Sequence, residues 1–374
     1  MFSTKELRFI PADSPPPPPK DFKSVEFGCT FAPYMLWADW DEKNGWSAPV
    51  IGEVQPITLH PAALVLHFAV ETMETLKAFR GVDDRIRMFR AEYKAHALNL
   101  GAQRATLPSF DEAAMLECWG RLAVANRDWI PPAGEGALYM RPMIIGTEAT
   151  FLHKRPRSAR LHINCTVWSK PFGGDGLTMY ADARYIRAWP GGVCEHKMGC
   201  VYAPTLLVNE VASINGCNQV LWLFDAEKEV VTEGGGMNLC FVMQTDTGKE
   251  LVTPAVAEDR EKTIVYPGLM RDSILQLKAA DFGLTAIGER ELSMNDLRLA
   301  SRQGLLLECF GCGTGAALCA VKSIFDKKSD NWITPTQAAQ SPVAKALAAF
   351  FDAICLGNEL PNSPSWAYVV DERH

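Results

Sequence analysis

Residues 195–204 read EHKMGCVYAP and place one lysine, Lys197, just before a predicted helix. Gly191 and Gly192 precede this lysine in a small-residue turn, and Tyr202 follows it by five residues. A lysine amine forms a Schiff base with a carbonyl cofactor once burial or neighbouring charges remove its proton. The alternative is an ordinary lysine at an exposed turn. The sequence of this stretch leaves two alternatives open: the amine of Lys197 is either an exposed surface charge or a nucleophile.

The size and charge of the chain favour a globular protein of two domains. Its 374 residues are 48% hydrophobic, and domains typically hold about 100–200 residues. The net charge of −7, without a basic stripe, argues against a nucleic-acid partner. The apolar runs are shorter than the ~20 residues that cross a bilayer. The first residues carry Glu6 and Asp13 and no apolar run, unlike a secretory signal. We therefore expect a cytoplasmic protein without a membrane partner.

The 11 cysteines do not indicate a disulfide framework in a chain of this length. Cys309 and Cys312 have the C-x-x-C spacing of a zinc site or a redox pair. A zinc site needs a second pair of ligands, and Cys194 with His196 is the nearest candidate in the sequence. Reduced, buried thiols are the interpretation that we favour, and we predict no metal.

Composition and turn signals divide the chain into four parts. Residues 1–25, which include Pro15 to Pro19, predict an extended, solvated leader. Residues 26–170 form a predicted N-terminal domain, and 185–374 form a larger C-terminal domain. The turn-rich sequence PFGGDG marks an interdomain loop at 171–184.

Hydrophobic patterning predicts a mixed α and β protein of the α+β class. In the first half, strands are expected at 57–60, 64–70, 85–90, 137–146 and 160–168, with helices at 91–105 and 110–129. The second of these helices follows Pro108 and has Ser109 and Asp111 as candidate caps. In the second half, strands at 218–224, 238–244 and 304–310 alternate with helices at 203–215, 269–280 and 342–354. We expect a small-molecule site where the loops of the two lobes meet.

Three glycine-containing stretches in the second half suit a flat, anionic ligand. Glu233 precedes three glycines after a predicted strand, so a carboxylate lies where backbone can approach a ring. Gly268 opens a predicted helix, whose first N–H groups bind anions such as phosphate. Thr314 lies between two glycines in GCGTG, a second small anion-binding loop. Taken alone, Glu233 is more typical of a helix cap or a surface acid, and the glycine pairs are more typical of simple turns.

Together, the residues of these segments and their order along the chain resemble those of the branched-chain amino acid aminotransferases, which are fold-type IV pyridoxal phosphate enzymes. The similarity runs from about Phe27 nearly to the C-terminus, through FGCTF, YMLW, LHPAALVLHFAVE, LKAFRG, RATLPSFD, LYMRPMIIGTE, YIRAWPGG, HKMG, NQVLWLF, TEGGGMNL, YPGLMRDSIL and GCGTG. The resemblance implies a homodimer with pyridoxal 5'-phosphate bound between a small N-terminal and a larger C-terminal domain.

The resemblance also implies roles at the cofactor ring. Lys197 matches the Schiff-base lysine, whose released amine then moves the substrate's α-proton. Tyr202 matches the phenol that hydrogen-bonds the 3′ oxygen of the cofactor. Glu233 matches the carboxylate that faces the pyridine nitrogen and favours its protonated form.

At the cofactor phosphate, the chain departs from the family. Contacts are implied for Gly268, Leu269 and Thr314. The family's phosphate-binding arginine is Ala97 here, and one of its threonines is Met270. The loss of an arginine contact costs roughly 1.5–3 kcal/mol. We hypothesise that Lys94, three residues before Ala97 and on the same helical face, replaces the arginine.

The substrate end departs as well. The resemblance implies a pocket formed by Phe31, Phe68, Met73, Tyr139, Arg141, Phe172, Gly236 and Gly315. Phe68 and Phe172 stand where the family has tyrosines, and Met73 stands where it has phenylalanine. Gly236 replaces a threonine. As pocket residues these would form a less polar, roomier wall; the alternative is that Phe68, Met73 and Phe172 simply pack in the core.

Three functions follow as hypotheses. The favoured one is an aminotransferase that moves an amino group between glutamate and an aliphatic 2-oxo acid, branched or longer, with a secondary metabolite such as a peptide toxin as one use of the product. The second is a non-catalytic, cofactor-binding relative with a weakened phosphate site. The third is a D-amino acid aminotransferase or a lyase of the same fold. The presence of Lys197, Tyr202 and Glu233 together favours the first.

Overall fold

The structure, a computed structural model, describes residues 2–169, 176–314, 317–358 and 364–372. Contacts divide the chain into two compact units. Unit 1 comprises Met1–Pro171, His196–Gly199 and Asp352–His374; unit 2 comprises Phe172–Glu195 and Cys200–Phe351. From the sequence we expect 196–199 and 352–374 in the C-terminal domain. The structure instead groups both segments with unit 1, because each is joined to it by backbone hydrogen bonds.

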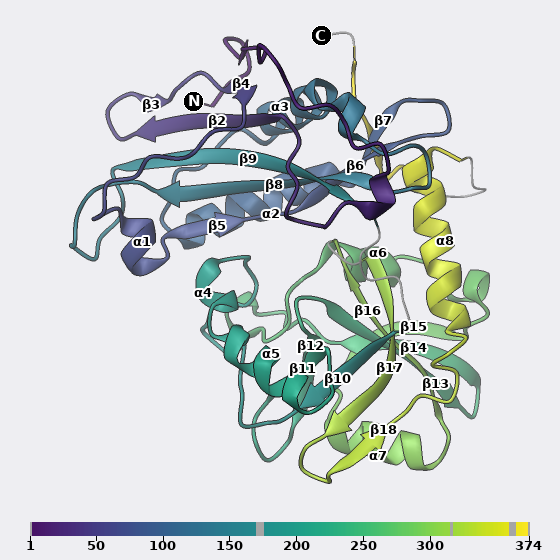
Figure 1. Cartoon of the computed structure of the whole chain (residues 1–374). Helices are drawn as coiled ribbons and strands as arrows, with labels where there is room; N and C mark the ends of the chain where they lie inside the picture. Colours follow the sequence, from purple (N-terminus) through teal and green to yellow (C-terminus); the bar gives the residue numbers. More distant parts are fainter. Residues whose placement is uncertain (1, 170–175, 315–316, 359–363, 373–374) are drawn as a thin grey trace. The chain divides into compact units, whose positions relative to one another are not determined.

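Unit 1 is built on one mixed sheet, which has ten strands among its described residues (Figure 1). The strands are β1 (Arg8–Phe9), β2 (Tyr34–Asp41), β3 (Gly45–Trp46), β4 (Val50–Glu53), β5 (Glu71–Met73), β6 (Leu76–Arg80), β7 (Ile86–Phe89), β8 (Ala137–Gly146), β9 (Ser158–Trp168) and β19 (Ala367–Val369). Their order is β1-β4-β2-β9-β8-β6-β7-β19, with β3 paired to β2 and β5 paired to β8.

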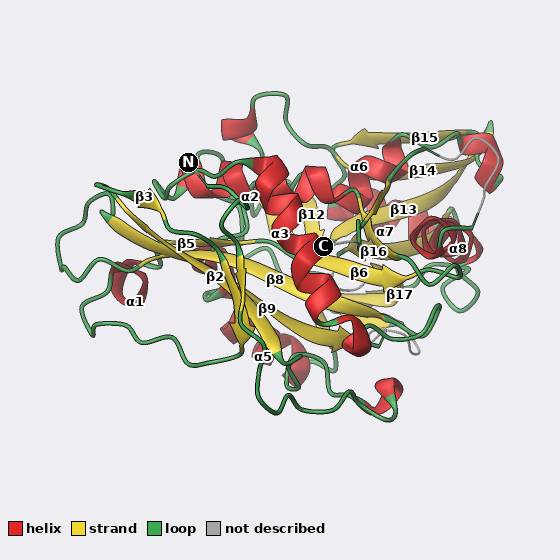
Figure 2. Cartoon of the chain, turned by 90° about the horizontal axis from the view of Figure 1, so that it is seen from above, coloured by secondary structure: helices red, strands yellow, loops and turns green. Residues whose placement is uncertain are grey.

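Two helices of unit 1 lie side by side across this sheet, α2 (Ala91–Arg104) and α3 (Glu112–Ala125) (Figure 2). The predicted cap of α3 is confirmed, since the Asp111 side chain accepts a hydrogen bond from Ala114 N at 2.8 Å. At its other end, the Asn126 side chain bonds both backbone groups of Tyr34 in β2. Shorter segments are α1 (Leu64–Phe68) and the 3₁₀ turns Phe22–Ser24 and Arg127–Trp129.

Unit 2 contains a second sheet, with nine strands among the described residues. They are β10 (Leu177–Ala181), β11 (Gln219–Phe224), β12 (Val230–Gly234), β13 (Asn238–Thr245), β14 (Gly248–Pro254), β15 (Ala286–Arg290), β16 (Leu306–Gly313), β17 (Ala317–Asp326) and β18 (Asn331–Ile333). The order is β12-β11-β10-β17-β16-β13-β14-β15, and β18 pairs with β17. Buried apolar residues of these strands form a core with Met294 and Leu297 of α7 (Met294–Arg302).

The remaining helices connect these strands. They are α4 (Gly199–Tyr202), α5 (Thr205–Ile214), α6 (Leu269–Leu275) and α8 (Pro342–Leu356), with 3₁₀ turns at Arg260–Lys262 and Ala279–Phe282. The division between the two units falls within α4 and within α8. No helix of the described residues is long and apolar enough to cross a membrane.

Most predicted elements are confirmed, including the strands at 137–146 and 160–168 and the helix at 91–105. Two predicted strands are wrong. Residues 57–60 have no regular structure, and 64–70 contain the one-turn helix α1, which ends at Ala69 with a φ of 49°. A short apolar run fits a helix as well as a strand, and only its tertiary surroundings decide between them.

The first residues of the leader differ from the solvated segment expected, whereas the proline run at 15–19 has no regular structure and is exposed over 15–18. Phe2 is buried, with its ring centroid 5.6 Å from that of Trp46 and 6.3 Å from that of Phe110. The strand Arg8–Phe9 pairs with β4. The segment is held because it offers apolar side chains and an extended backbone to the edge of the sheet.

Candidate active site

The Lys197 segment is held by the backbone of β5 in unit 1. The carbonyl oxygen of Lys197 accepts hydrogen bonds from Met73 N at 2.9 Å and from Thr72 Oγ1 at 3.3 Å. The Lys197 side chain is partly buried. Backbone bonds to a strand fix the position of the lysine more firmly than an exposed turn would. The structure therefore disfavours the reading of Lys197 as an ordinary surface lysine.

Gly199, two residues on, makes a close approach to Glu71 at the start of β5. The Gly199 N–H donates to the Glu71 carboxylate, and a β-carbon at position 199 would collide with that carboxylate. Burial raises the pKa of Glu71, and the bond from Gly199 opposes this effect. A larger residue at 199 would force the Glu71 carboxylate to move, so glycine allows the segment carrying Lys197 to lie directly against β5.

Three predicted substrate residues come together beside this anchor. Arg141 Nη2 donates to Tyr139 Oη at 2.9 Å, and Arg141 Nη1 lies 3.6 Å from the sulfur of Met73. Tyr139 and Arg141 are two apart on β8, so their side chains point to the same face of the sheet. The ring of Phe27 packs edge-on against Tyr139 at 5.0 Å between centroids. Met73 also donates its N–H to Lys197, so this group adjoins the lysine.

The two predicted phenylalanines of unit 1 occupy different surroundings. Phe31 forms an isolated bridge with Thr166, which is itself paired with Tyr139, so Phe31 lies about 10 Å from Tyr139 across the sheet. Phe68 is 38% exposed, and its ring centroid lies 5.3 Å from that of His153. An exposed ring contradicts the alternative that Phe68 packs in the core.

Lys94 is almost completely buried in α2. Its Nζ donates to Glu74 Oε2 at 2.9 Å, and both side chains are at most 2% exposed. Burial lowers the pKa of Lys94; the Glu74 carboxylate opposes that effect and the charge of Lys197 adds to it. A phosphate contact from Lys94 would therefore have to share the ammonium with Glu74. The binding of the cofactor phosphate by Lys94 therefore stays a prediction. So does the weaker phosphate binding expected because Ala97 stands where the family has an arginine.

In unit 2, Glu233 is buried on β12 between two donors. Its Oε1 accepts from Tyr266 N at 3.1 Å, and its Oε2 forms an ion pair with Arg187 Nη1. The guanidinium carbon of Arg187 lies 5.6 Å from the centroid of the Tyr202 ring. The structure thus connects two predicted cofactor residues, Tyr202 and Glu233, through an arginine that lies between them.

The predicted phosphate residues of unit 2 lie near the same strand. Gly268 caps the seven-residue helix α6, and its own N–H donates to Tyr266 O at 2.8 Å. Asn238 Nδ2 donates to the same carbonyl at 2.7 Å, and a β-carbon at 268 would collide with Asn238. Phosphate contacts would therefore fall on the following N–H groups, beginning at Leu269. Thr314 follows β16, which pairs with β13 at Asn238.

Among the predicted glycines, Gly236 has no atom within 4 Å of the place where a β-carbon would lie. Open space beside the Glu233 strand agrees with a roomy site at this point. Phe172 and Gly315, predicted for the substrate pocket, lie outside the described residues.

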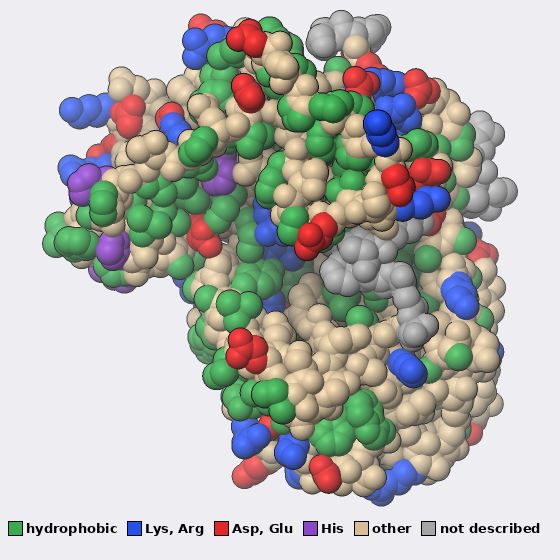
Figure 3. Space-filling view, viewed as in Figure 1, with side chains coloured by type: hydrophobic (Ala, Val, Ile, Leu, Met, Phe, Trp, Pro, Cys, Tyr) green, Lys and Arg blue, Asp and Glu red, His purple; other side chains and the backbone are tan. Residues whose placement is uncertain are grey.

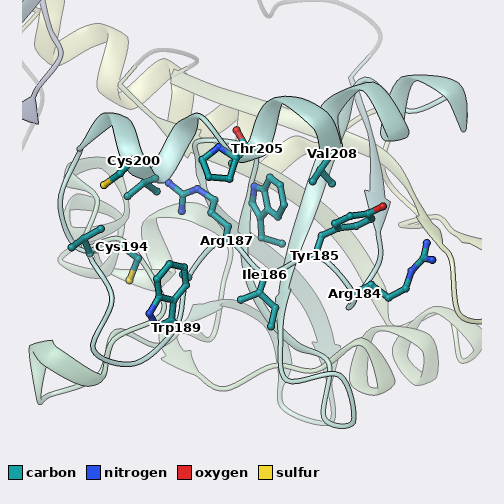
Figure 4. A pocket seen from close by; sticks show the side chains of 14 residues that line it. Arg184, Tyr185, Ile186, Arg187, Trp189, Cys194, Cys200, Thr205 and Val208 are labelled. Atoms are coloured by element: carbon teal, nitrogen blue, oxygen red, sulfur yellow. The ribbon is translucent and has the colours of Figure 1, made fainter. Parts of the chain in front are cut away.

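A cavity of about 470 Å³ adjoins Arg187 within unit 2 (Figure 4). Trp189, Cys194, Cys200 and Trp222 are among the residues that line it. Arg187 Nε is buried and has no hydrogen-bond partner among the described residues. The guanidinium is thus shared between the ion pair with Glu233 and the wall of this cavity.

The cysteine pair is placed as the thiol interpretation expects. Cys309 and Cys312 are buried on β16, and burial raises the pKa of the Cys309 thiol well above its ordinary value. A hydrogen bond with Cys240, together with burial, does the same for Cys312. Protonated thiols are poor metal ligands and poor nucleophiles.

Sequence reasoning missed several residues that contact the candidate site residues. Arg187 stands in the quoted motif YIRAWPGG, and Phe27 begins FGCTF, so the motifs contained both residues without indicating their contacts. Glu71 and Glu74 lie on either side of Met73 and bind the Lys197 segment and Lys94. Their partners are distant in sequence, and no local pattern pairs them.

Comparisons with known proteins agree with this geometry. No protein-family model matches the chain. The chain is 38% identical over 330 residues to the cytosolic branched-chain-amino-acid aminotransferase of Rattus norvegicus, covering 87% of this chain and 78% of the relative. It is 38% identical over 328 residues to the mitochondrial enzyme of Bos taurus, covering 86% and 81%.

Its fold matches that of a solved branched-chain amino acid aminotransferase from Thermobaculum terrenum in its pyridoxal phosphate form. The TM-score is 0.68 at 20% identity, with 91% of this chain and 99% of the other covered. The fold-type IV architecture expected from the sequence is therefore confirmed. With more than a third of its residues identical to curated enzymes over most of both lengths, the chain belongs to the branched-chain-amino-acid aminotransferase family.

Proposed function

We propose that the chain transfers an amino group between glutamate and an aliphatic 2-oxo acid, with pyridoxal 5'-phosphate as cofactor and Lys197 as the catalytic amine. In the overall reaction, glutamate and the 2-oxo acid become 2-oxoglutarate and a new amino acid. Family membership supports the reaction class and the cofactor. Glutamate as donor rests on the resemblance of the sequence.

One observation carries the residue assignment, namely the anchoring of Lys197 to β5. Its carbonyl accepts the N–H of Met73, and Met73 contacts Arg141, which bonds Tyr139. A lysine is thus fixed beside an arginine and a phenol, the groups that bind a carboxylate. Arg141 orients the Tyr139 hydroxyl and supplies positive charge for an anionic substrate.

The residues of unit 2 fit the proposed cofactor. The Glu233 carboxylate is buried and ion-paired with Arg187, which fixes its position. A carboxylate has about four acceptor positions, so Glu233 can accept a ring N–H in addition to its two present donors. The space beside Gly236 leaves room at the same strand.

Pyridoxal 5'-phosphate, when bound, supplies an aldehyde that carries the amino group and a ring that withdraws electrons from the substrate. Glu233 would hold the proton on the ring nitrogen. Tyr202 would donate a hydrogen bond from its hydroxyl to the cofactor's 3′ oxygen. Lys197 would take the proton from the substrate's α-carbon with its ε-nitrogen and return it during the second half of the reaction. Leu269 and Thr314, with Gly268 setting the turn, would bind the phosphate.

We propose a preference for aliphatic 2-oxo acids longer than the keto acid of valine. Methionine at 73 offers an adaptable wall, and Gly236 leaves open space. The use of the product in a secondary metabolite stays a prediction of the sequence.

We also propose that two copies of the chain form a homodimer. Leu206, Leu207 and Ile214 are exposed on α5, and such apolar patches mark interaction surfaces. In unit 1, exposed Phe68 and Phe151 gather with histidines near α1, where Figure 3 shows hydrophobic side chains in green and histidines in purple. Sedimentation equilibrium should give twice the mass of the chain.

The proposed location is the cytoplasm, as the name of the rat relative says of that enzyme. The alternative location is the mitochondrion, as the name of the bovine relative says of that enzyme. Immunoblots of cell fractions would distinguish the two.

The function is tested by incubating purified protein, saturated with cofactor, with glutamate and a panel of branched, straight-chain and aromatic 2-oxo acids. We expect a new amino acid to form in equal amount with 2-oxoglutarate. Breakdown of an amino acid substrate without formation of a new amino acid would favour a lyase, and the D-enantiomer as product would favour a D-amino acid aminotransferase. Protein that binds no cofactor and forms no product would favour the non-catalytic relative.

A further inference from the structure

Unit 1 carries two polar side chains whose buried hydrogen-bonding atoms are unused. Asn164 and His162 are two residues apart on β9, so they point to the same face of the sheet. Asn164 Oδ1 and His162 Nδ1 are buried, and neither has a hydrogen-bond partner among the described residues. Thr166, the next residue on this face, differs, because its hydroxyl donates to Thr30 O at 2.6 Å. A buried polar atom without a partner costs about 1–3 kcal/mol, so both side chains call for a partner that the described residues do not provide.

The register of the sheet places both side chains beside the candidate substrate residues. Asn164 lies directly opposite Arg141 of β8, and His162 lies opposite Met143. Opposite residues of antiparallel strands share a face, with β-carbons about 4.5–5.5 Å apart. Met143 is in turn opposite Met73 of β5, whose sulfur lies 3.6 Å from Arg141 Nη1. The two polar side chains therefore extend the face formed by Arg141 and Met73.

The chemistry of the two groups favours an uncharged partner. Burial lowers the pKa of His162 to about 4, and the charge of Arg160 contributes, so the imidazole is neutral at neutral pH. A neutral imidazole offers one donor and one acceptor, and Asn164 Oδ1 only accepts. A hydroxyl or a carboxamide both donates and accepts. A carboxylate cannot donate to Asn164, and an alkyl group can do neither.

We propose that Asn164 and His162 determine substrate specificity by binding an uncharged polar group, a hydroxyl or a carboxamide, on the aliphatic side chain of the substrate. This specificity rests on the proposed function, in which Arg141 and Tyr139 lie at the substrate end of the site. It makes the proposed preference for long aliphatic substrates more specific, because the side chain that extends past Met73 then ends in a hydrogen-bonding group.

The test compares amino acid substrates that differ only in this group. The holoenzyme is assayed with 2-oxoglutarate, whose consumption is followed, and with two pairs of amino acids of equal size. The pairs are 5-hydroxynorvaline with norleucine, and glutamine with homoleucine. In at least one pair, we expect kcat/KM of the polar member to exceed that of the alkyl member by about 10-fold, since the alkyl member leaves both buried atoms unpaired.

Four variants assign this ratio to the two side chains. Asn164→Leu and His162→Phe introduce apolar side chains of similar size, and each should lower the ratio of the two kcat/KM values by about 10-fold. His162→Asn keeps a hydrogen-bonding atom near the position of Nδ1 and should retain most of the ratio. Thr166→Val is the matched control, because its hydroxyl already donates to Thr30 O, and it should leave the ratio unchanged.

Stability separates a change of specificity from a failure to fold. Asn164→Leu removes an unpaired buried polar atom, so the free energy of unfolding in urea should equal or exceed that of the wild type. A stable variant with a lowered ratio therefore supports the role of Asn164 in binding the substrate.

Three other results would overturn the proposal, and they are distinguishable. If the enzyme converts norleucine but both ratios stay near 1, or neither apolar variant changes them, the specificity assigned to Asn164 and His162 is wrong while the proposed function holds. If the apolar variants sediment as monomers with unaltered ratios, the two polar atoms bind a second copy of the chain instead of a substrate. If no amino acid is converted, the proposed function fails, and the specificity fails with it.

Discussion

Arg187 and Glu233 form an ion pair in which the two side chains are only 4% and 3% exposed. Forty-six residues separate them in the chain, yet the arginine also reaches the face of Tyr202. Burial of two charges is costly unless they are paired, so each of these side chains depends on the other for its place in the core.

This relationship predicts the effect of removing the arginine. Arg187→Met should lower the free energy of unfolding by about 3–5 kcal/mol, because it leaves a buried carboxylate without its cation. The variant should also bind pyridoxal phosphate more weakly, because the Glu233 carboxylate loses the ion-pair partner that fixes its position. Urea unfolding and a cofactor titration measure the two effects.

The double variant Arg187→Met, Glu233→Gln serves as its control. It should recover stability, because no charge is left unpaired, but not cofactor affinity. If the single variant were as stable as the wild type, the ion pair would not support Glu233.

The close approach of Gly199 to Glu71 predicts a second effect. Gly199→Ala should reduce kcat by about 100-fold, because a shift of roughly 1 Å in a catalytic group has that effect. The β-carbon collides with the Glu71 carboxylate. The carboxylate then gives up its bond to Gly199 N, and we expect the segment that carries Lys197 to shift with the loss of this contact. Steady-state kinetics measure the loss.

Gly288→Ala is a matched control, since no atom lies within 4 Å of the new β-carbon. It should leave kcat unchanged. Equal activity of the two alanine variants would show that the Lys197 segment tolerates displacement.

The proposed pocket predicts a change of preference on restoring larger residues. Met73→Phe combined with Gly236→Thr should lower kcat/KM for long aliphatic 2-oxo acids by about 10-fold relative to the keto acid of valine. Met73→Leu, which conserves volume, should leave the ratio nearly unchanged. If neither variant changes the ratio of the two kcat/KM values, Met73 and Gly236 do not line the substrate pocket.

His162, buried on β9, predicts a dependence of stability on pH. Burial lowers the pKa of His162 to about 4 from its ordinary 6.5, and the nearby Arg160 contributes. Between these values the unfolded chain binds a proton that the folded protein does not. The free energy of unfolding should therefore fall by about 3 kcal/mol as the pH drops from 6.5 to 4.

Urea unfolding of the cofactor-free protein across this range, compared with His162→Gln, measures the contribution. The variant should show a shallower decline than the wild type. Parallel curves would mean that His162 does not contribute to the pH dependence.

Local pattern predicts much of the fold but few of its contacts. The strand at 137–146 and the cap at Asp111 were predictable because alternation and capping are encoded within a few residues. The helix at 64–68 was not, because its short apolar run has no period of its own and its helical form is set by the surrounding structure.

The residues of the candidate site could be predicted from the sequence, but their contacts could not. Motif resemblance identifies Lys197, Tyr202 and Glu233 as candidates. It does not reveal that Lys197 is anchored to β5, 125 residues away, because that contact consists of backbone hydrogen bonds. Nor does it predict the burial of Lys94 against Glu74, since nothing local distinguishes a buried lysine from an exposed one.

The most direct measurement is to locate the cofactor on the chain. Protein saturated with pyridoxal phosphate would be reduced with borohydride, digested, and its peptides mapped by mass spectrometry. The account predicts one modified peptide, with the cofactor attached to the ε-nitrogen of Lys197, and no attachment in Lys197→Ala. Attachment at Lys94 or another lysine, or no attachment at all, would contradict it.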